Sequence, residues 1–418
     1  MATSRPPQTG AQPTQAYVWA WLPGATDPVT AGIVWLQGST VWFRYGSSYR
    51  ARDDAIPLYT PELPLVPEPI APLDGLSIAG CINDAGPDAW GQRVILHRRL
   101  GAGVGSADTT DLNPITYLLE SGTDRIGGLD FQERPDQYVP RHEPASLDQL
   151  IEGAKAVERG VELPEPIASA FQHASSIGGA RPKVLLRDGD RTLIAKLQSS
   201  GDQFPVVKAE GVAMELARRV GLNVASVDVT RVAGLDVLLV ERFDRPTPNE
   251  RRIVISALTM LQLDELAGRY ATYVELADLI RAAFSEPRAT LRELFARIAF
   301  NIHVGNTDDH ARNHAAFWDG TELTLTPAYD IQPCNRTGRT AEQAMAYDRV
   351  GNRWSRTSLL VSAAEHYLLD RQEAQSIVDS QRAVIEDEWS EAADVARLTP
   401  VERAFLWRRQ ILNPYIDE

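Results

Sequence analysis

The spacing of apolar residues changes twice along this chain of 418 residues, and this change limits its possible folds more than any other feature. Residues 17–65 hold short apolar and aromatic runs between Gly, Pro or Asp, a pattern typical of strands and turns: VWAWL, AGIVWLQ and STVWFRY. Residues 175–245 mix strand-like runs with one helical stretch, and helical spacing dominates after Arg245. This order predicts an α+β fold with a small sheet lobe, a helical lobe and a ligand cleft between them.

These changes in residue spacing and composition predict four segments of the chain. Residues 1–16 are rich in Pro, Gln, Thr and Gly, which predicts a disordered tail. Residues 17–145 form an N-terminal β-rich subdomain. Residues 146–245 form the mixed part of the sheet lobe, beginning with a helix capped by Ser146. Residues 246–418 form the helical lobe.

The composition narrows the class of protein. Hydrophobic residues make up 44% and charged residues 23%, which is ordinary for a soluble globular protein. The net charge of −14 weighs against a broad nucleic-acid-binding surface. No apolar run is long enough for a membrane helix, and the N-terminus lacks the apolar region of a secretory signal. With only Cys81 and Cys334, we expect a cytoplasmic protein without a disulfide framework or a membrane partner.

The strongest chemical pattern is GNTDDHARNHAAFW at residues 305–318, followed by LTPAYDI. Asp308 and Asn313 lie five residues apart, just after an apolar helix predicted over residues 291–302, and Asp330 follows a strand-like run. Phosphoryl transfer needs one carboxylate to accept the proton of the attacking hydroxyl, and further oxygen ligands for Mg²⁺. Protein kinases space an Asp and an Asn in this way, although the HRD and DFG strings are absent here. The Asp–Asn spacing alone would favour loop caps; the surrounding motifs favour a kinase.

A lysine and a glutamate upstream fit the same chemistry. Lys196 lies in the strand-like run TLIAKLQ, on the face opposite the run of leucines. Glu210 follows on the helix predicted for KAEGVAMELARRVG, which Gly221 ends. Kinases hold the phosphates of ATP with a strand lysine paired to a helix glutamate. A surface lysine and a solvated glutamate are the alternative.

Two further runs carry weaker signals. SSIGGARPK at residues 175–183 is a loop in which Gly178 and Gly179 would let backbone N–H groups approach phosphates. By itself it also fits an ordinary turn, because it is neither G-x-G-x-x-G nor a Walker A loop. The run VLLVERFDR ends the sheet region, where Glu241 and Phe243 could flank adenine. Core packing is the alternative for Phe243.

Two histidines stand four residues apart beside the Asp308 motif. His310 and His314 could place two metal ligands on one helix face, but the glutamate of an H-E-x-x-H zinc site is absent. We therefore expect a hydrogen-bonded histidine that braces the loop.

Taken in order, SSIGGARPK, IAKLQ, ERFDR, GNTDDHARNH and LTPAYDI resemble the HipA-like serine/threonine kinases, the toxin halves of bacterial toxin–antitoxin pairs. Three N-terminal runs, VWFRYG, PLVPEP and LLESGTDRIGGL, resemble the family more loosely, so the resemblance covers roughly residues 17–410. It implies a protein-kinase-like fold with an extra N-terminal subdomain. It also implies ATP and Mg²⁺ as cofactors.

The resemblance implies a role for each matching residue. Asp308 would be the catalytic base, and Asn313 and Asp330 the Mg²⁺ ligands. Ser176 would be a regulatory autophosphorylated serine, with Ser175 as the competing site. The implied cofactor-binding set is Ile177, Gly178, Gly179, Ala180, Arg181, Lys183, Lys196, Glu241, Phe243 and Asn313.

The resemblance also implies partners and a target. The usual partner is a helix-turn-helix antitoxin, and through it operator DNA; known family targets are aminoacyl-tRNA synthetases. The chain departs from the family pattern at Arg181-Pro182, where a Gln-Glu pair is common, and at Asp309, where Gly is common. Our leading hypothesis is a protein kinase that phosphorylates a translation protein and slows growth. The alternatives are a small-molecule kinase of related fold and a catalytically silent co-repressor scaffold.

Overall fold

The computed structural model describes residues 11–100, 109–141, 183–198, 202, 204–232, 234–336 and 338–418. Its contacts divide the chain into two compact units. The first contains residues up to 200 together with 244–254 and 319–321, and the second contains residues 201–243, 255–318 and 322–418. The chain therefore passes from the second unit to the first between Phe243 and Asp244.

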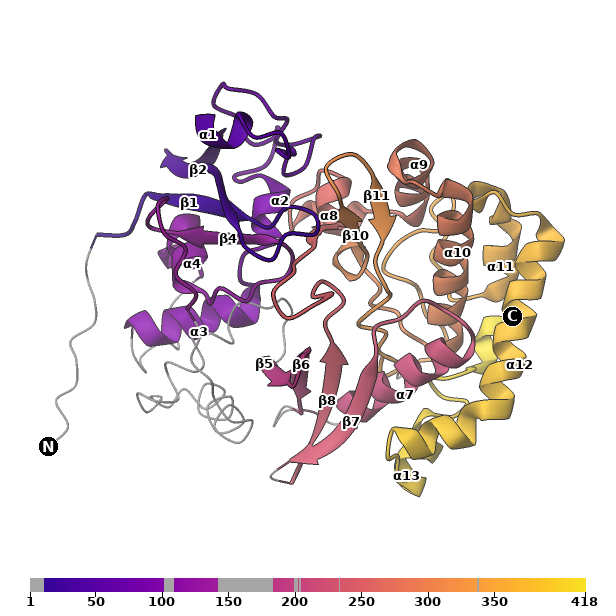
Figure 1. Cartoon of the computed structure of the whole chain (residues 1–418). Coiled ribbons are helices and arrows are strands. Elements are labelled where there is room, and N and C mark those ends of the chain that lie inside the picture. Colours follow the sequence, from indigo (N-terminus) through magenta and orange to yellow (C-terminus); the bar gives the residue numbers. More distant parts are fainter. Residues whose placement is uncertain are drawn as a thin grey trace, which may run out of the picture. The chain divides into compact units, whose positions relative to one another are not determined.

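The first unit is built on an antiparallel sheet of four strands in the order β3-β2-β1-β4 (Figure 1). Its strands are β1 (Gln15–Ala20), β2 (Val29–Gln37), β3 (Thr40–Tyr45) and β4 (Leu129–Gln132). Burial alternates along β3, whereas β4 is buried throughout; Val18, Val34, Phe43 and Phe131 lie in the core. The three runs predicted as strands are thus confirmed, and a fourth strand joins them from far along the chain.

Short helices and a hairpin complete the first unit. The helices are α1 (Ser47–Arg50), α2 (Gly80–Asn83), α3 (Ala89–Leu100), η2 (Thr109–Asp111) and α4 (Pro114–Glu120). Asn113 caps α4 by accepting a hydrogen bond from the backbone N–H of Thr116. The hairpin consists of β5 (Lys183–Asp188) and β6 (Arg191–Leu197), which pair antiparallel across a turn at Gly189.

The second unit begins with a helix and another hairpin. Helix α7 (Val206–Arg219) precedes the antiparallel pair β7 (Val227–Val232) and β8 (Leu235–Glu241). Gly211 of α7 faces this hairpin so closely that a Cβ atom there would lie 2.4 Å from a methyl group of Val229. The helix ends at Gly221, as predicted, with φ of +85°.

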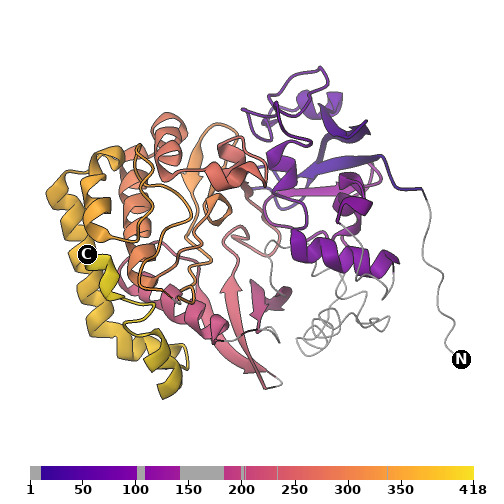
Figure 2. The same cartoon turned by 180° about the vertical axis from the view of Figure 1, so that it is seen from behind.

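The rest of the second unit is mostly helical, as expected (Figures 1 and 2). Its helices are α8 (Ala257–Met260), η3 (Ala267–Tyr270), α9 (Tyr273–Ala283), α10 (Pro287–Val304), η4 (Ala311–Asn313), α11 (Thr357–Ser362), η5 (Ala364–Tyr367), α12 (Arg371–Val395), α13 (Pro400–Leu406) and η6 (Pro414–Asp417). A small sheet is made of β9 (Ile253–Ser256), which begins in the first unit, β10 (Ala315–Trp318) and β11 (Leu323–Leu325).

Helix α10 is the central helix of this unit. The apolar stripe predicted from its sequence is fully buried: Leu291, Leu294, Phe295, Ile298 and Ile302. Helices α9 and α12 pack on it, and capping boxes at Thr272 and Asp370 fix where these two begin. Among the described residues, no helix combines the length and hydropathy that a membrane span requires. The helix expected to start at Ser146 lies outside the described residues.

Candidate active site

The Asp308 motif begins where α10 ends. Gly305 takes the left-handed conformation, with φ of +69°, and the N–H of Asn306 donates to the carbonyl of Asn301 (2.9 Å). A Cβ atom on Gly305 would lie 2.6 Å from the carbonyl oxygen of Gln410, so a larger residue would clash as well as strain the backbone. The glycine of GNTDDH therefore stops the helix and turns the chain into the loop that carries Asp308.

Asp309 anchors this loop in the core. Its carboxylate oxygen Oδ2 accepts hydrogen bonds from the Tyr273 hydroxyl, from Nδ2 of Asn301 (2.8 Å) and from Nε2 of His314 (2.8 Å). All four side chains are buried. Burial, and then the charge of Asp309, hold the pKa of Tyr273 well above its usual value, so this phenol stays a donor. One aspartate thus fixes the loop through three donors, two from helices α9 and α10 and one from the end of the loop itself.

This arrangement confirms that a histidine of the motif braces the loop. His314 donates to Asp309, and its ring meets that of Tyr273 edge to face at 5.7 Å. His310 does not join this contact and lies half-buried at the start of η4. Among the described residues, no group of three or more His, Cys, Asp or Glu side chains is arranged to hold a metal.

Asp308 is held by its backbone and exposes its carboxylate. Its N–H donates to Oδ1 of Asn306 (3.4 Å), and its carbonyl accepts from Nδ2 of Asn313 (3.2 Å) and from the N–H of His310 (3.0 Å). The side chain itself is exposed, unlike that of its neighbour Asp309. Because Nδ2 of Asn313 is used on the loop, its amide oxygen is the atom left to accept or ligate. The predicted base and one predicted metal ligand are therefore in direct contact.

Asp330 has a non-glycine backbone in the left-handed region, with φ of +60°. Such a conformation costs roughly 1–3 kcal/mol and persists only where the surroundings impose it. Here the preceding segment is fixed by Ala328, which exchanges backbone hydrogen bonds with Asn223 (2.8 Å) and Ala225 (2.9 Å). The backbone at Asp330 therefore fixes the direction in which this side chain leaves the segment.

Two contacts join the Asp330 segment to the Asp308 loop. The N–H of Cys334 donates to the carbonyl of Gly305 (2.9 Å), and the Tyr329 hydroxyl donates to the carbonyl of Arg312 (2.7 Å). The second unit therefore brings the predicted base and both predicted metal ligands into one bonded network.

Phe243 belongs to the same neighbourhood. Its ring lies 5.6 Å from that of Tyr329 and 5.9 Å from that of Phe317, measured between centroids. Phe243 and Glu241 are both half-buried, and the N–H of Glu241 donates to the carbonyl of Ser226 (2.8 Å). Phe243 is therefore a packing residue of the Asp330 segment with part of its surface still open.

The remaining predicted residues lie elsewhere in the chain. Lys183 and Lys196 are opposite one another on β5 and β6 of the first unit. Lys183 is buried, with its ammonium 4.0 Å from the Asp88 carboxylate, and Lys196 is half-buried. Glu210 is buried on α7 of the second unit, so its pairing with Lys196 stays a prediction. The predicted loop residues and serines lie outside the described residues: Ser175, Ser176, Ile177, Gly178, Gly179, Ala180 and Arg181.

Sequence reasoning missed the residues that support the site. Asn301 and Tyr273 hold Asp309, while Arg297 donates to the carbonyls of Asn223 (3.2 Å) and Thr326 (2.9 Å) beside the Asp330 segment. A signal for Asn301 and Arg297 was present, since both interrupt the buried side of α10. Polar residues on a core face need partners, and here their partners are the two loops.

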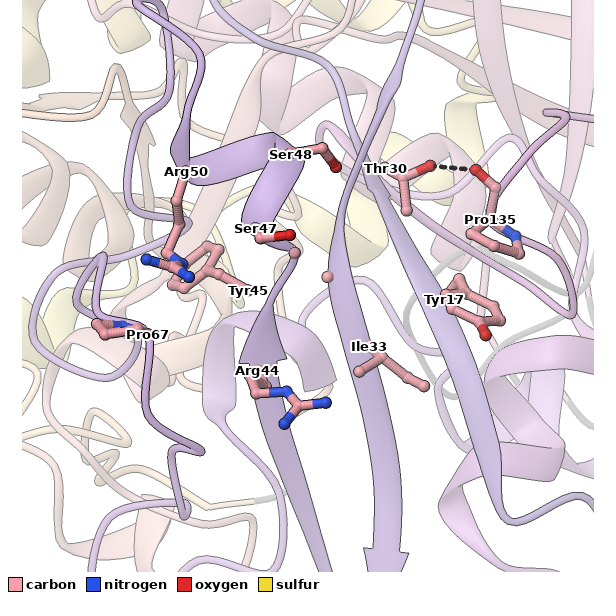
Figure 3. A pocket seen from close by; sticks show the side chains of 12 residues that line it. Tyr17, Thr30, Ile33, Arg44, Tyr45, Ser47, Ser48, Arg50, Pro67 and Pro135 are labelled. Carbon is pink, nitrogen blue, oxygen red and sulfur yellow. Dashed lines mark hydrogen bonds between the residues drawn. The ribbon is translucent and has the colours of Figure 1, made fainter.

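A separate cavity of about 430 Å³ lies in the first unit (Figure 3). Arg44 and Arg50 lie along it, and Thr30 donates to the carbonyl of Pro135 (2.7 Å) at its other side. None of the predicted site residues lines it. The lining residues are Tyr17, Thr30, Gly32, Ile33, Arg44, Tyr45, Gly46, Ser47, Ser48, Arg50, Pro67 and Pro135.

Comparison with known proteins identifies the family. The HipA-like C-terminal domain family matches residues 175–389, half of the chain, and the chain belongs to this family. The match covers the Asp308 motif, the Asp330 segment and both predicted lysines. The family resemblance expected from the sequence motifs is confirmed.

Two curated relatives are similar over part of their length. A putative kinase Y4mE of Sinorhizobium fredii is 24% identical over 265 residues, which cover 57% of this chain and 60% of that protein. The serine/threonine-protein kinase toxin HipA of Shewanella oneidensis is 26% identical over 183 residues, 37% of this chain and 42% of the toxin. The chain thus spans about 60% and 42% of the curated relatives it matches.

A solved structure is similar over nearly the whole chain. It is a chain of the Shewanella oneidensis MR-1 complex of HipA, HipB and operator DNA, with a TM-score of 0.68, 20% identity and coverage of 94% of this chain and 95% of that one. The expected fold is confirmed: α+β and protein-kinase-like, with an additional N-terminal β-rich subdomain.

Proposed function

We propose that this chain is an ATP- and Mg²⁺-dependent protein serine/threonine kinase of the HipA toxin type, with Asp308 as its catalytic base. One observation carries the proposal. The Asp308 carboxylate is exposed on a loop whose backbone is fixed by Asn313 and by the buried Asp309, and that loop is bonded to the segment of Asp330. An exposed acid on a rigid, buried support suits a group that must meet a substrate hydroxyl.

The chemistry assigned to the loop is in-line phosphoryl transfer. Asp308 orients the substrate hydroxyl and takes its proton as the oxygen bonds to the γ-phosphorus of ATP. The bond to the bridging oxygen breaks and ADP leaves with that electron pair. Asn313, through its amide oxygen, and Asp330 would hold Mg²⁺; they are oxygen donors of the kind this ion prefers. The bound ion would neutralise charge on the phosphates.

The residues proposed to hold the nucleotide are those that the family resemblance implies. Lys196 and Lys183 supply cations for the phosphates, together with the loop of Ile177, Gly178, Gly179, Ala180 and Arg181. Glu241 and Phe243 would flank the adenine. In this proposal residues 17–145 are the N-terminal subdomain, 146–245 carry ATP-binding groups, and 246–418 carry the catalytic and metal loops.

We assign a protein substrate and a DNA-binding partner. The HipA chain of similar fold is in a complex with HipB and operator DNA, which supports a HipB-like helix-turn-helix antitoxin for this chain. The net charge of −14 suits a partner that supplies most of the cations facing DNA phosphates. The target is a translation protein in the cytoplasm, an aminoacyl-tRNA synthetase by family analogy, and its phosphorylation would slow growth.

Ser176 is the proposed site of autophosphorylation. A phosphate there adds a charge of about −1.5 to −2 at neutral pH. Beside the triphosphate that charge would be repelled, so the phosphorylated loop would leave ATP uncovered and lower its affinity. This switch would turn the kinase off after its own reaction.

A phosphoproteomic comparison tests the proposal. Cells expressing the wild-type chain without its partner should stop growing and gain new phosphoserine or phosphothreonine sites, among them Ser176. Cells expressing Asp308→Asn at equal level should show neither change. An unchanged phosphoproteome in growing wild-type cells would count against a protein kinase. New phosphosites that persist with Asp308→Asn would count against Asp308 as base.

A further inference from the structure

The motif SGTDRIGGL in residues 121–129 has no place in the proposed transfer site, yet it takes part in several buried charged contacts. It closes around residues 244–254, the segment that directly follows Phe243. Glu241 and Phe243 thus lie immediately before the point where the chain enters the first unit. The contacts just after this crossing therefore determine how firmly residues 241–243 are held.

Arg245 is the centre of these contacts, and its side chain is only 3% exposed. Nη2 donates to the Asp124 carboxylate (2.8 Å) and to the carbonyl of Arg125 (2.5 Å). Nη1 donates to the Asp244 carboxylate (2.8 Å) and to the carbonyl of Gly127 (3.1 Å), and Nε reaches Asp124 as well (3.2 Å). All three guanidinium nitrogens are engaged, in directions that only a planar fork provides.

Asp244 holds the segment from its other side. Its carboxylate accepts the N–H of Gly127 (2.7 Å) in addition to Arg245, and its carbonyl accepts the N–H of Arg252 (3.1 Å). Gly127 has φ of +82°, and a Cβ atom there would lie 3.3 Å from the backbone nitrogen of Val254. A side chain at this position would therefore crowd the backbone of Val254, in addition to straining its own backbone.

The motif is in turn fixed to the sheet of the first unit. Arg125 is fully buried and donates to Asp130 on β4 (2.7 Å) and to the Ser121 hydroxyl (2.6 Å). Burial lowers the pKa of Arg125 to about 10, so it remains a cation at neutral pH. Arg251 stacks 3.7 Å above the ring of Trp21 and donates to the carbonyl of Thr123 (2.7 Å). Residues 244–252 are thus held to a rigid sheet.

On the preceding side, Phe243 is held by the aromatic rings of Tyr329 and Phe317 in the second unit. The stretch from Glu241 to Asp244 is therefore fixed at both ends, by aromatic packing before the crossing and by buried charge after it. Networks of buried charge contribute little net stability but fix geometry, because a misplaced member is left buried without its partner.

We propose that Arg245, with Asp124 and Asp244, is a positioning cluster for nucleotide binding, which holds Glu241 and Phe243 in the conformation that receives the adenine of ATP. The proposal rests on the proposed kinase function. Arg245 touches no reacting atom, so it acts on nucleotide affinity and leaves the transfer step itself unchanged.

Arg245→Lys is the most informative variant, because it keeps the charge and removes the fork. Asp124→Asn is the second variant, since it keeps the shape and removes a partner charge. Arg52→Lys is the matched control: Arg52 makes a two-point contact with the Asp54 carboxylate in the same unit (2.8 Å for each nitrogen), and among the described residues its side chain contacts neither residues 121–130 nor residues 244–254. Melting temperatures identify the variants that fold.

Two readouts are measured on the full chain. The dissociation constant of Mg²⁺–ATP should rise about 10-fold or more in Arg245→Lys and Asp124→Asn, since small misplacements in a site carry losses of up to about 10²-fold. Turnover at saturating ATP should stay within about twofold of wild type. Amide hydrogen exchange in residues 235–243 should quicken in both variants. Arg52→Lys should change neither readout.

The outcomes separate the two proposals. Unchanged exchange in residues 235–243 in folded Arg245→Lys and Asp124→Asn would overturn the positioning cluster, whatever the affinity. If exchange is faster in the variants but the wild-type protein does not bind ATP, the cluster does hold Glu241 and Phe243, and the proposed nucleotide site is refuted. Faster exchange with wild-type ATP affinity would refute the link between the cluster and nucleotide binding.

Discussion

Replacing Asp308 with asparagine is expected to lower the rate of phosphoryl transfer by about 10²-fold or more, the usual contribution of a general base and its charge. Asparagine has the same shape and can still accept the hydroxyl, but it cannot take the proton. Asp308 is exposed, and its backbone makes the contacts that hold the loop, so the variant should keep its fold and its ATP affinity. Transfer of labelled γ-phosphate to protein measures the rate.

Thr307→Ala is the control for this experiment, since it changes the adjacent half-buried residue and keeps both carboxylates. It should transfer phosphate at close to the wild-type rate. A folded Asp308→Asn protein that transfers phosphate as fast as wild type would show that Asp308 is not the base. An equal loss of transfer rate in Thr307→Ala would show that the rate depends on the shape of the loop and not on the Asp308 carboxylate.

Replacing Asp309 with alanine is expected to lower the stability of the protein much more than replacing its neighbour Asp308, the proposed base. The change leaves the Asn301 amide and the His314 ring buried without this acceptor, and it leaves the Tyr273 hydroxyl with only its longer bond to the carbonyl of residue 309 (3.4 Å). Each unsatisfied buried group costs about 1–3 kcal/mol, so the two groups without an acceptor give an expected loss of about 2–6 kcal/mol in the free energy of unfolding. Urea unfolding followed by circular dichroism measures this difference.

Asp308→Ala is the matched comparison, because it removes a carboxylate one residue away that is exposed. Exposed substitutions usually change stability by no more than about 0.5 kcal/mol, so the two alanine variants should differ clearly. Equal midpoints of unfolding for Asp308→Ala and Asp309→Ala would contradict the assignment of one aspartate to the substrate and the other to the core.

The fold followed from sequence wherever the pattern was local. The apolar stripe of α10, the aromatic runs of the first sheet and the glycine at 221 all depend on periodicity or backbone conformation within a few residues. Strand β4 was not predicted, because its pairing with β1 joins residues more than a hundred positions apart. The crossing between units after Phe243 has the same origin, since the contacts of Arg245 reach back to Asp124.

The residues of the candidate site also divide into those that can be predicted from local sequence and those that cannot. Asp308, Asn313 and Asp330 are predicted from spacing and residue type, because phosphoryl transfer requires oxygen donors, and their roles stay predictions. The role of Asp309 as the anchor of the loop does not follow from the sequence, in which Asp309 stands out only as a departure from the family pattern. Its three donors come from α9, α10 and the end of the loop, a meeting that only tertiary packing produces. The expected roles of Lys196 and Glu210 stay predictions.

The most direct test of the account is the binding of ATP to the purified chain with and without Mg²⁺, since it needs no knowledge of the protein substrate. Calorimetric titration should show one ATP per chain with Mg²⁺ present, and affinity at least about 10-fold lower when Mg²⁺ is removed or when Asp330 is replaced by asparagine, because a metal-held phosphate loses its main charge partner. Absence of ATP binding by the folded wild-type chain, or binding indifferent to both Mg²⁺ and Asp330→Asn, would contradict it.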